Sequence, residues 1–218
     1  MGSQIAEILL NIGAVHYYDT VLFRFTSGTV SPVYVDCRKL ISYPEFRNIV
    51  VNSAIDLIRE IPGEAPDVIA GGETAGIPYA AFLAERLQLP MIYVRKQPKE
   101  FGRKSRIEGF LERGNRVLLV EDLIFDAQSK LSFADAIRDN GGIIDTTLVV
   151  FEYGQRGVRA QLASAGLRLI SLTSWNELLD LTVARHVFSE AQAEVVRRFL
   201  SNPAGWLSEG NVPASQVG

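Results

Sequence analysis

Four short runs of β-favouring residues with little polar alternation constrain the fold of this 218-residue chain more than any other feature. They are DVIAGG (67–72), MIYVRK (91–96), VLLVEDL (117–123) and TTLVVFEY (146–153). Helical patterns at 77–87 and 128–140 lie between them. Nearly continuous apolar strands that alternate with helices are typical of a parallel sheet covered on both faces. The sequence therefore predicts an α/β fold with a doubly wound, mainly parallel sheet.

The flanking segments predict smaller elements around this sheet. Their apolar spacing, a Ser-Gly/Ser-Pro turn and a capping box that begins at Ser189 are the signals. The predicted elements are helices over 3–12, 45–60 and from Ser189 to about 200, two strands within 20–38, and a strand over 167–173.

These elements predict one domain over residues 1–200, with a small N-terminal β element and a helical C-terminal appendage. Residues 201–218 are rich in small and polar side chains, and we expect this tail to be loosely ordered.

The composition argues against several classes of function. The net charge of −3 implies no general attraction to nucleic acid or anionic membranes. No apolar run approaches the ~20 residues of a membrane span, and the N-terminus lacks the pattern of a signal peptide. The single Cys37 excludes an internal disulfide framework, and His16 and His186 lie too far apart to suggest a metal site. We expect a cytoplasmic protein that binds neither nucleic acid nor membranes.

A polar loop follows each of the four core strands. Ligands of doubly wound sheets bind beyond the carboxyl ends of the strands, so we expect these loops to gather around one ligand. The loops are Gly71–Gly76, Arg95–Lys99, Glu121–Ser129 and Phe151–Gly157.

Adjacent carboxylates, Glu121 and Asp122, follow the most apolar of the strands. Neighbours on a strand point to opposite faces, but at a strand end both can turn toward the crevice. There they could accept hydrogen bonds from the vicinal hydroxyls of a ribose, or hold Mg²⁺ through water. Alternatively, they cap the next helix or solvate the strand end.

Two strand-to-helix turns are candidate phosphate sites. A helix that starts near Gln128 offers unpaired amides, and Ser129 adds a hydroxyl donor. In Gly71–Gly76 the glycines allow close approach of a phosphate, and Thr74 is another donor. Tight packing of helix against strand explains many glycine-rich turns equally well.

The stretch from Arg95 to Arg106 carries six cations in twelve residues, with Pro98 and Gly102 against regular structure. A cationic loop beside an acidic pair suits a polyanionic substrate with a metal, such as a pyrophosphate ester. The alternative is a solvated basic surface loop. A basic patch for nucleic acid is not extended elsewhere in the chain.

In this order, the stretches resemble motifs of the type I phosphoribosyltransferases, and specifically of the orotate phosphoribosyltransferases, over roughly residues 5–200. The matching segments are FTSGTVSPVYVDCR, GGETAGIPYAAFLAERLQLPMIYVRK, RKQPKEFG, and VLLVEDL with Ser129-Lys130. The resemblance implies transfer of phosphoribosyl from phosphoribosyl pyrophosphate to orotate, with Mg²⁺. It also implies a homodimer in which the basic loop reaches over the partner's active site.

The resemblance further implies a role for each matching residue. Lys99 would support the leaving pyrophosphate, and Glu121 and Asp122 would hold the ribose hydroxyls and order the metal. The remaining substrate-binding residues are Arg95, Lys96, Glu73 and Thr74 for the pyrophosphate, Phe125, Asp126, Ala127, Gln128 and Ser129 for the 5′-phosphate, and Phe25, Thr26, Ser27 and Gly28 for the base.

Phe125–Gln128 departs from the family pattern, which is Thr-Thr-Gly-Gly or Thr-Asp-Gly-Gly. Phe125 replaces a hydroxyl donor, and Asp126 adds a negative charge beside a phosphate. We expect Ala127 and Gln128 to replace glycines in left-handed or strained backbone, where a Cβ costs roughly 1 kcal/mol.

Smaller departures lie in three other motifs. Thr26 stands where many members have lysine, Phe101 where many have histidine, and Tyr153 at the place of an arginine for which Arg156 could substitute.

Two hypotheses follow from these departures. The chain is a working orotate phosphoribosyltransferase, or it is a catalytically impaired paralogue that binds, regulates or acts on another ligand. A dehydrogenase is disfavoured because GGETAG lacks the GxGxxG spacing and Arg95-Lys96 ends the next strand in place of an acidic residue.

Overall fold

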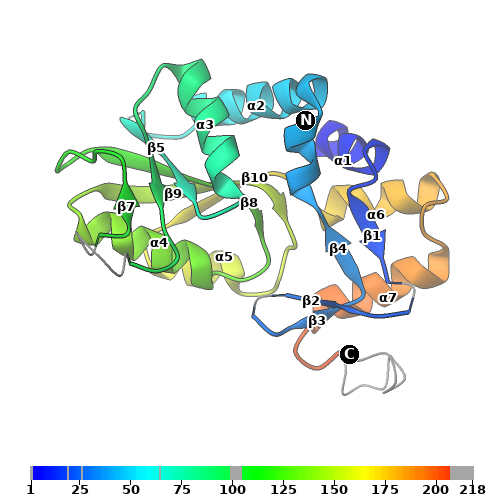
Figure 1. Ribbon diagram of the computed structural model, residues 1–218. Coiled ribbons are helices and arrows are strands. Elements are labelled where there is room, and N and C mark those ends of the chain that lie inside the picture. Colours follow the sequence, from blue (N-terminus) through cyan, green and yellow to red (C-terminus); the bar gives the residue numbers. More distant parts are fainter. Residues whose placement is uncertain (1, 19, 26, 64, 99–104, 207–218) are drawn as a thin grey trace.

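A six-stranded sheet forms the centre of the computed structural model, which describes residues 2–18, 20–25, 27–63, 65–98 and 105–206. The strand order is β10-β9-β8-β5-β6-β7 (Figure 1), and every neighbouring pair is parallel except β6 and β7. The strands are β5 (Val68–Gly72), β6 (Met91–Val94), β7 (Ile107–Glu108), β8 (Arg116–Ile124), β9 (Ile143–Glu152) and β10 (Arg168–Ser174). This confirms the predicted α/β class and mainly parallel sheet.

Helices cover both faces of the sheet (Figure 1). Two separate groups of buried apolar side chains fill the spaces between helices and sheet, one on each face. One face carries α1 (Gly2–Asn11), α2 (Pro44–Arg59) and α3 (Gly76–Leu87), and the other carries α4 (Gln128–Asp139) and α5 (Val158–Ser164). The four helices predicted from apolar spacing in this part of the chain therefore form, with ends within two residues of those expected. The short α5 was not predicted.

The order of the strands reverses between β5 and β8. From β5 the chain moves outward to β6 and β7, then returns to form β8 on the other side of β5. The helices that follow β5 and β8, α3 and α4, lie on opposite faces. Such a switch point leaves a crevice between two adjacent strand ends, and this is where open α/β sheets bind ligands.

The N-terminal element contains four short strands where the sequence predicted two. β1 (Val15–Tyr17) pairs with β4 (Val33–Val35), and β2 (Phe23–Arg24) pairs with β3 (Val30–Ser31). Proline cannot donate a ladder hydrogen bond, and Pro32 separates β3 from β4. The prediction missed β1 and β3, runs of only three and two residues. A 3₁₀ helix, η1 (Cys37–Ser42), then leads into α2.

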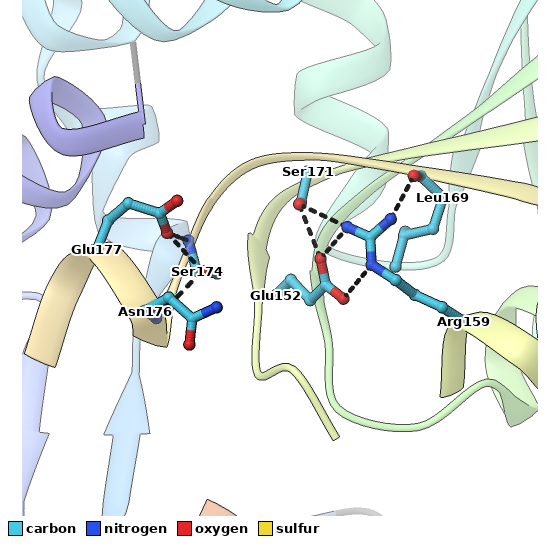
Figure 2. A network of polar contacts seen from close by, with 7 residues as sticks. All are labelled: Glu152, Arg159, Leu169, Ser171, Ser174, Asn176 and Glu177. Atoms are coloured by element: carbon cyan, nitrogen blue, oxygen red, sulfur yellow. Dashed lines mark hydrogen bonds and ion pairs between the residues drawn. The ribbon is translucent and has the colours of Figure 1, made fainter. Parts of the chain in front are cut away.

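Two capped helices, α6 (Trp175–Ala184) and α7 (Glu190–Ser201), follow the sheet. The capping box predicted at Ser189 is confirmed, since its hydroxyl accepts the Gln192 amide. A second box, which the sequence analysis missed, pairs Ser174 with Glu177 at the start of α6 (Figure 2).

One residue of the tail that was expected to be loosely ordered, Trp206, packs against the domain. Trp206 is fully buried, with its ring 5.6 Å from that of Phe199. The large apolar area of this one indole outweighs the polar composition around it. Among the described helices, none is long and apolar enough to cross a bilayer.

Tyr153 joins the end of β9 to the N-terminal element. It is buried, and its hydroxyl accepts a hydrogen bond of 3.1 Å from the amide of Val35 in β4. We expect Tyr153→Phe to lower the free energy of unfolding by about 1–3 kcal/mol, because a buried amide loses its partner. Urea denaturation measures this, with the exposed Tyr43→Phe as the matched control. Equal stability of the two variants would contradict the prediction.

Candidate active site

The turn between β5 and α3 lies directly on strand β8. A Cβ added to Gly72 would stand 2.2 Å from Oε1 of Glu121, and one added to Gly76 would stand 2.3 Å from the carbonyl oxygen of Val120. Both glycines are therefore required by close packing of the turn against β8. The Glu73–Thr74 peptide between them is cis, and Thr74 is exposed.

Strand β8 is longer than expected and does not end at the acidic pair. It runs to Ile124, and Glu121 and Leu123 pair with Val149 and Phe151 of β9. Because side chains alternate along a strand, Glu121 and Asp122 lie on opposite faces of the sheet. The expectation that both turn into the crevice at a strand end is therefore wrong.

Glu121 is buried beside α4, with 6% of its surface exposed. Its Oε2 accepts a 2.9 Å hydrogen bond from Nζ of Lys130, which is itself 4% exposed. Burial raises the pKa of Glu121, and the positive charge of Lys130 opposes that rise.

Asp122 is half-buried on the face that carries α3 and the N-terminal element. Burial raises its pKa, and the charges of Lys130 and, more weakly, Arg38 oppose the rise. Arg38 is exposed and donates hydrogen bonds to Asp36 (3.0 Å) and to the hydroxyl of Tyr34 (2.7 Å). The carboxylate of Asp36, the guanidinium of Arg38 and the phenol of Tyr34 thus lie near one another at this edge of the sheet.

Lys130 is the residue whose role the sequence analysis missed. Its ammonium also donates to the carbonyl of Leu123 at 2.6 Å and to the hydroxyl of Ser129 at 3.2 Å. A buried lysine requires a charged partner, and Glu121 nine residues earlier supplies it. A lysine in the first turn of a helix opposes the helix dipole, and this is the one signal in the sequence that could have drawn attention to it.

The loop between β8 and α4 has an ordinary backbone conformation. Ala127, the N-cap residue, is fully buried with φ −82° and ψ −12°, and neither it nor Gln128 has a positive φ. The expected cost of a Cβ in left-handed backbone therefore does not arise. The carboxylate of Asp126 accepts the amide of Gln128 at 3.0 Å, so the first amide of α4 already faces a negative group.

Phe125 packs into an aromatic cluster beneath the N-terminal hairpin. Its ring lies 4.4 Å from that of Phe25, 5.4 Å from Tyr153 and 6.1 Å from Phe199. The loop expected to bind the 5′-phosphate and the hairpin expected to bind the base are therefore in direct contact.

The turn at the tip of this hairpin is held by backbone hydrogen bonds. The amide of Phe25 donates to the carbonyl of Thr29, and the amide of Gly28 donates to the carbonyl of Phe25. Gly28 has a φ of +87°. The hydroxyl of Ser27 is exposed and lies 3.1 Å from that of Thr29. Thr26 lies outside the described residues.

The end of β6 is tied to the β5–α3 turn. The carboxylate of Glu73 accepts a 2.7 Å hydrogen bond from the backbone amide of Lys96. The side chain of Lys96 is exposed. Arg95 lies 3.6 Å from Glu108 of β7, and its carbonyl accepts from Arg106 at 2.8 Å. Residues 99–104, including Lys99 and Phe101, lie outside the described residues, so the predicted role of Lys99 stays a prediction.

Two arginines follow β9, Arg156 in the loop and Arg159 in α5. Arg156 is exposed, whereas Arg159 binds Glu152 through two hydrogen bonds of 2.8 and 2.5 Å and reaches Ser171 and the carbonyl of Leu169 (Figure 2). Glu152 and Arg159 thus brace β9 against α5 and β10.

Within the described ranges, no three or more histidine, cysteine or acidic side chains come together as a metal site.

Comparison with known proteins assigns the family. No model of a known protein family matches the chain. It is 49% identical over 211 residues to an orotate phosphoribosyltransferase of Jannaschia sp., covering 96% of this chain and 92% of that protein. The chain belongs to the orotate phosphoribosyltransferases.

Solved structures agree with this assignment. The orotate phosphoribosyltransferase of Aeropyrum pernix is 33% identical with a TM-score of 0.69, covering 81% of this chain and 97% of that one. UMP synthase of Leishmania donovani is 26% identical with a TM-score of 0.78, covering 91% of this chain and 42% of that one. The resemblance found in the motifs is therefore confirmed, and the orotate phosphoribosyltransferases are glycosyltransferase-type enzymes of pyrimidine biosynthesis.

Proposed function

We propose that this orotate phosphoribosyltransferase transfers the phosphoribosyl group of phosphoribosyl pyrophosphate to orotate, giving orotidine monophosphate and pyrophosphate. Membership of the family at 49% identity over 96% of the chain is the observation that carries the proposal. The switch point between β5 and β8 supports it, since the turn at Gly72–Gly76, the half-buried Asp122 and the start of α4 meet there.

The leaving pyrophosphate binds beside the end of β6. Lys96 directs an exposed ammonium from this point, and the backbone of Glu73-Thr74 lies next to it because Glu73 accepts the Lys96 amide. Arg95 adds a second cation, and Lys99 follows in the same loop. Negative charge builds on pyrophosphate as it departs from the anomeric carbon, and these cations stabilise that charge.

Asp122 accepts hydrogen bonds from the ribose hydroxyls and orients the sugar as its anomeric carbon gains positive charge. Mg²⁺ prefers oxygen ligands and keeps several waters, so substrate oxygens supply most of its coordination, with Asp122 ordering its water shell. When bound, the ion neutralises charge on the pyrophosphate.

The 5′-phosphate binds at the start of α4, where Ser129 offers its hydroxyl and the helix its dipole. Asp126 already caps the Gln128 amide, so repulsion by its carboxylate weakens this contact. The base binds at the hairpin, against Phe25 and the turn at Ser27-Gly28. The enzyme acts as a cytoplasmic homodimer.

A second candidate function is binding of a ligand without turnover. The contact of Phe125 with Phe25 favours it, because the two rings fill space between the phosphate loop and the base-side hairpin.

An assay of orotate consumption with phosphoribosyl pyrophosphate and Mg²⁺ tests the main proposal. We expect turnover by the wild-type protein and its loss in Lys99→Ala. Tight binding of phosphoribosyl pyrophosphate without any turnover would instead support the second candidate.

Replacement of Phe125–Gln128 by Thr-Asp-Gly-Gly tests the phosphate loop. We expect the KM for phosphoribosyl pyrophosphate to fall by about tenfold, because a threonine hydroxyl gains a charge-assisted hydrogen bond worth about 1.5–3 kcal/mol. The melting temperature should fall, because Phe125 leaves its aromatic cluster. The control is Phe125→Leu, which loses the ring without gaining a hydroxyl. Turnover that appears only after the replacement would overturn the main proposal for the natural chain.

A further inference from the structure

The ammonium of Lys130 uses all three of its N–H donors inside the protein. It binds Oε2 of Glu121 on β8, the carbonyl of Leu123 near the end of β8, and the hydroxyl of Ser129 in the first turn of α4. With 4% of its surface exposed, it cannot also bind a substrate without breaking one of these contacts.

The other side of Glu121 supports the β5–α3 turn. Its Oε1 lies 2.2 Å from the position that a Cβ on Gly72 would take, and 2.7 Å from the position of a Cβ on Gly76. The buried pair of Glu121 and Lys130 therefore contacts the turn at Gly72–Gly76 and both ends of the loop that joins β8 to α4, at Leu123 and at Ser129.

Asp122 has a different environment, although it is the next residue. It points to the opposite face, is half-buried, and lies near Arg38 and Tyr34 of the N-terminal element. A ribose in the crevice can reach this carboxylate without displacing a buried ammonium.

We propose that Glu121 and Lys130 are positioning residues that set the spacing between the pyrophosphate turn and the phosphate loop, and that Asp122 alone of the acidic pair contacts the sugar. This rests on the proposed function. It divides the adjacent carboxylates, which the motif treats as equivalent, into one that binds the substrate and one that holds the site together.

Glu121→Gln and Asp122→Asn separate these roles. Glu121→Gln leaves the buried ammonium of Lys130 without a charged partner, so we expect the KM for phosphoribosyl pyrophosphate to rise by about tenfold as the loops separate, with kcat within about threefold of wild type because Asp122 and the reacting groups remain. Asp122→Asn removes a charged acceptor from the substrate, and we expect kcat/KM to fall by about 10- to 100-fold. A loss of kcat in Glu121→Gln as large as in Asp122→Asn would overturn the proposal.

Lys130→Met is the complementary variant, with Arg197→Met of an exposed ion pair on α7 as its control. We expect the KM for phosphoribosyl pyrophosphate to rise by about tenfold or more with kcat largely kept, because the loops separate but the reacting groups remain. An unchanged KM would contradict the proposed role of Lys130.

Hydrogen exchange distinguishes failure of this inference from failure of the proposed function. Should the wild type show no turnover, the proposed function fails, yet Lys130→Met must still speed amide exchange in both 72–76 and 123–130. Unchanged exchange in either loop would overturn the inference. If Lys130→Met does not fold, Glu121→Gln carries the same exchange test, with faster exchange expected in both loops and unchanged exchange in either loop as the contrary result.

Discussion

Gly76→Ala is expected to lower the free energy of unfolding by about 3–5 kcal/mol, the range of severe core strain, and to abolish turnover. Its Cβ would lie 2.3 Å from the carbonyl of Val120 and 2.7 Å from Oε1 of Glu121. The first contact is with the backbone of a central strand, so a side-chain rotation cannot relieve it. The α3 end of the turn at Gly72–Gly76 must then move away from β8.

Chemical denaturation and the orotate assay measure these two losses. Gly114→Ala is the matched control, because Gly114 has φ +90° but no atom lies within 4 Å of its added Cβ. It should cost only the roughly 1–2 kcal/mol of left-handed backbone and leave turnover intact. A Gly76→Ala protein as stable and active as Gly114→Ala would show that the turn is not packed on β8 as described.

Lys130→Met is expected to cost about 3–5 kcal/mol near neutral pH, because it leaves the buried carboxylate of Glu121 without its cation. Arg197→Met, in an exposed pair with Glu194, should change stability by less than about 1 kcal/mol. Thermal or urea denaturation of both variants measures the difference. A double variant that also carries Glu121→Leu should recover much of the loss, since an apolar pair leaves no buried charge.

The loss in Lys130→Met should depend on pH. Burial already raises the pKa of Glu121 above its ordinary value of 4.5, and removal of Lys130 raises it further in the folded protein. An acid with a raised folded-state pKa contributes stability that is present below the unfolded pKa and is lost as pH rises through the folded one. The deficit relative to wild type should therefore be small near pH 4.5 and grow toward pH 8. A deficit that shrinks with rising pH would contradict the assignment of Glu121 as the uncompensated group.

Local patterns predicted most of the regular structure. The four core strands, the longer helices and the capping box at Ser189 depend on residues within one or two turns, so the sequence displays their signals directly. The three-residue β1 and the two-residue β3 and β7 were not predicted, because such short strands form only through pairing with other strands. Trp206 is buried for the same reason, by contact with Phe199 and not by its neighbours in the chain.

The sequence predicted which loops form the candidate site, but not how their side chains lie relative to one another. Their order along the chain identified the family, because each motif is local. The separation of Glu121 from Asp122 was not predicted, since it depends on where β8 stops hydrogen bonding to β9. The loop Phe125–Gln128 looked strained by comparison with glycine-containing relatives, yet Ala127 lies in the right-handed helical region.

The sequence by itself determined the α/β class and the family, because apolar periodicity and short motifs survive as local patterns along the chain. Only the tertiary structure decided which carboxylate is half-buried and which is buried against Lys130. Burial and charge pairing depend on segments far apart in the sequence. Here Gly72 and Gly76 pack against one side of Glu121 on β8, and Lys130 of α4 binds its other side. The two adjacent carboxylates therefore have different surroundings, since Glu121 is buried against the ammonium of Lys130 and Asp122 is half-buried on the opposite face of the sheet.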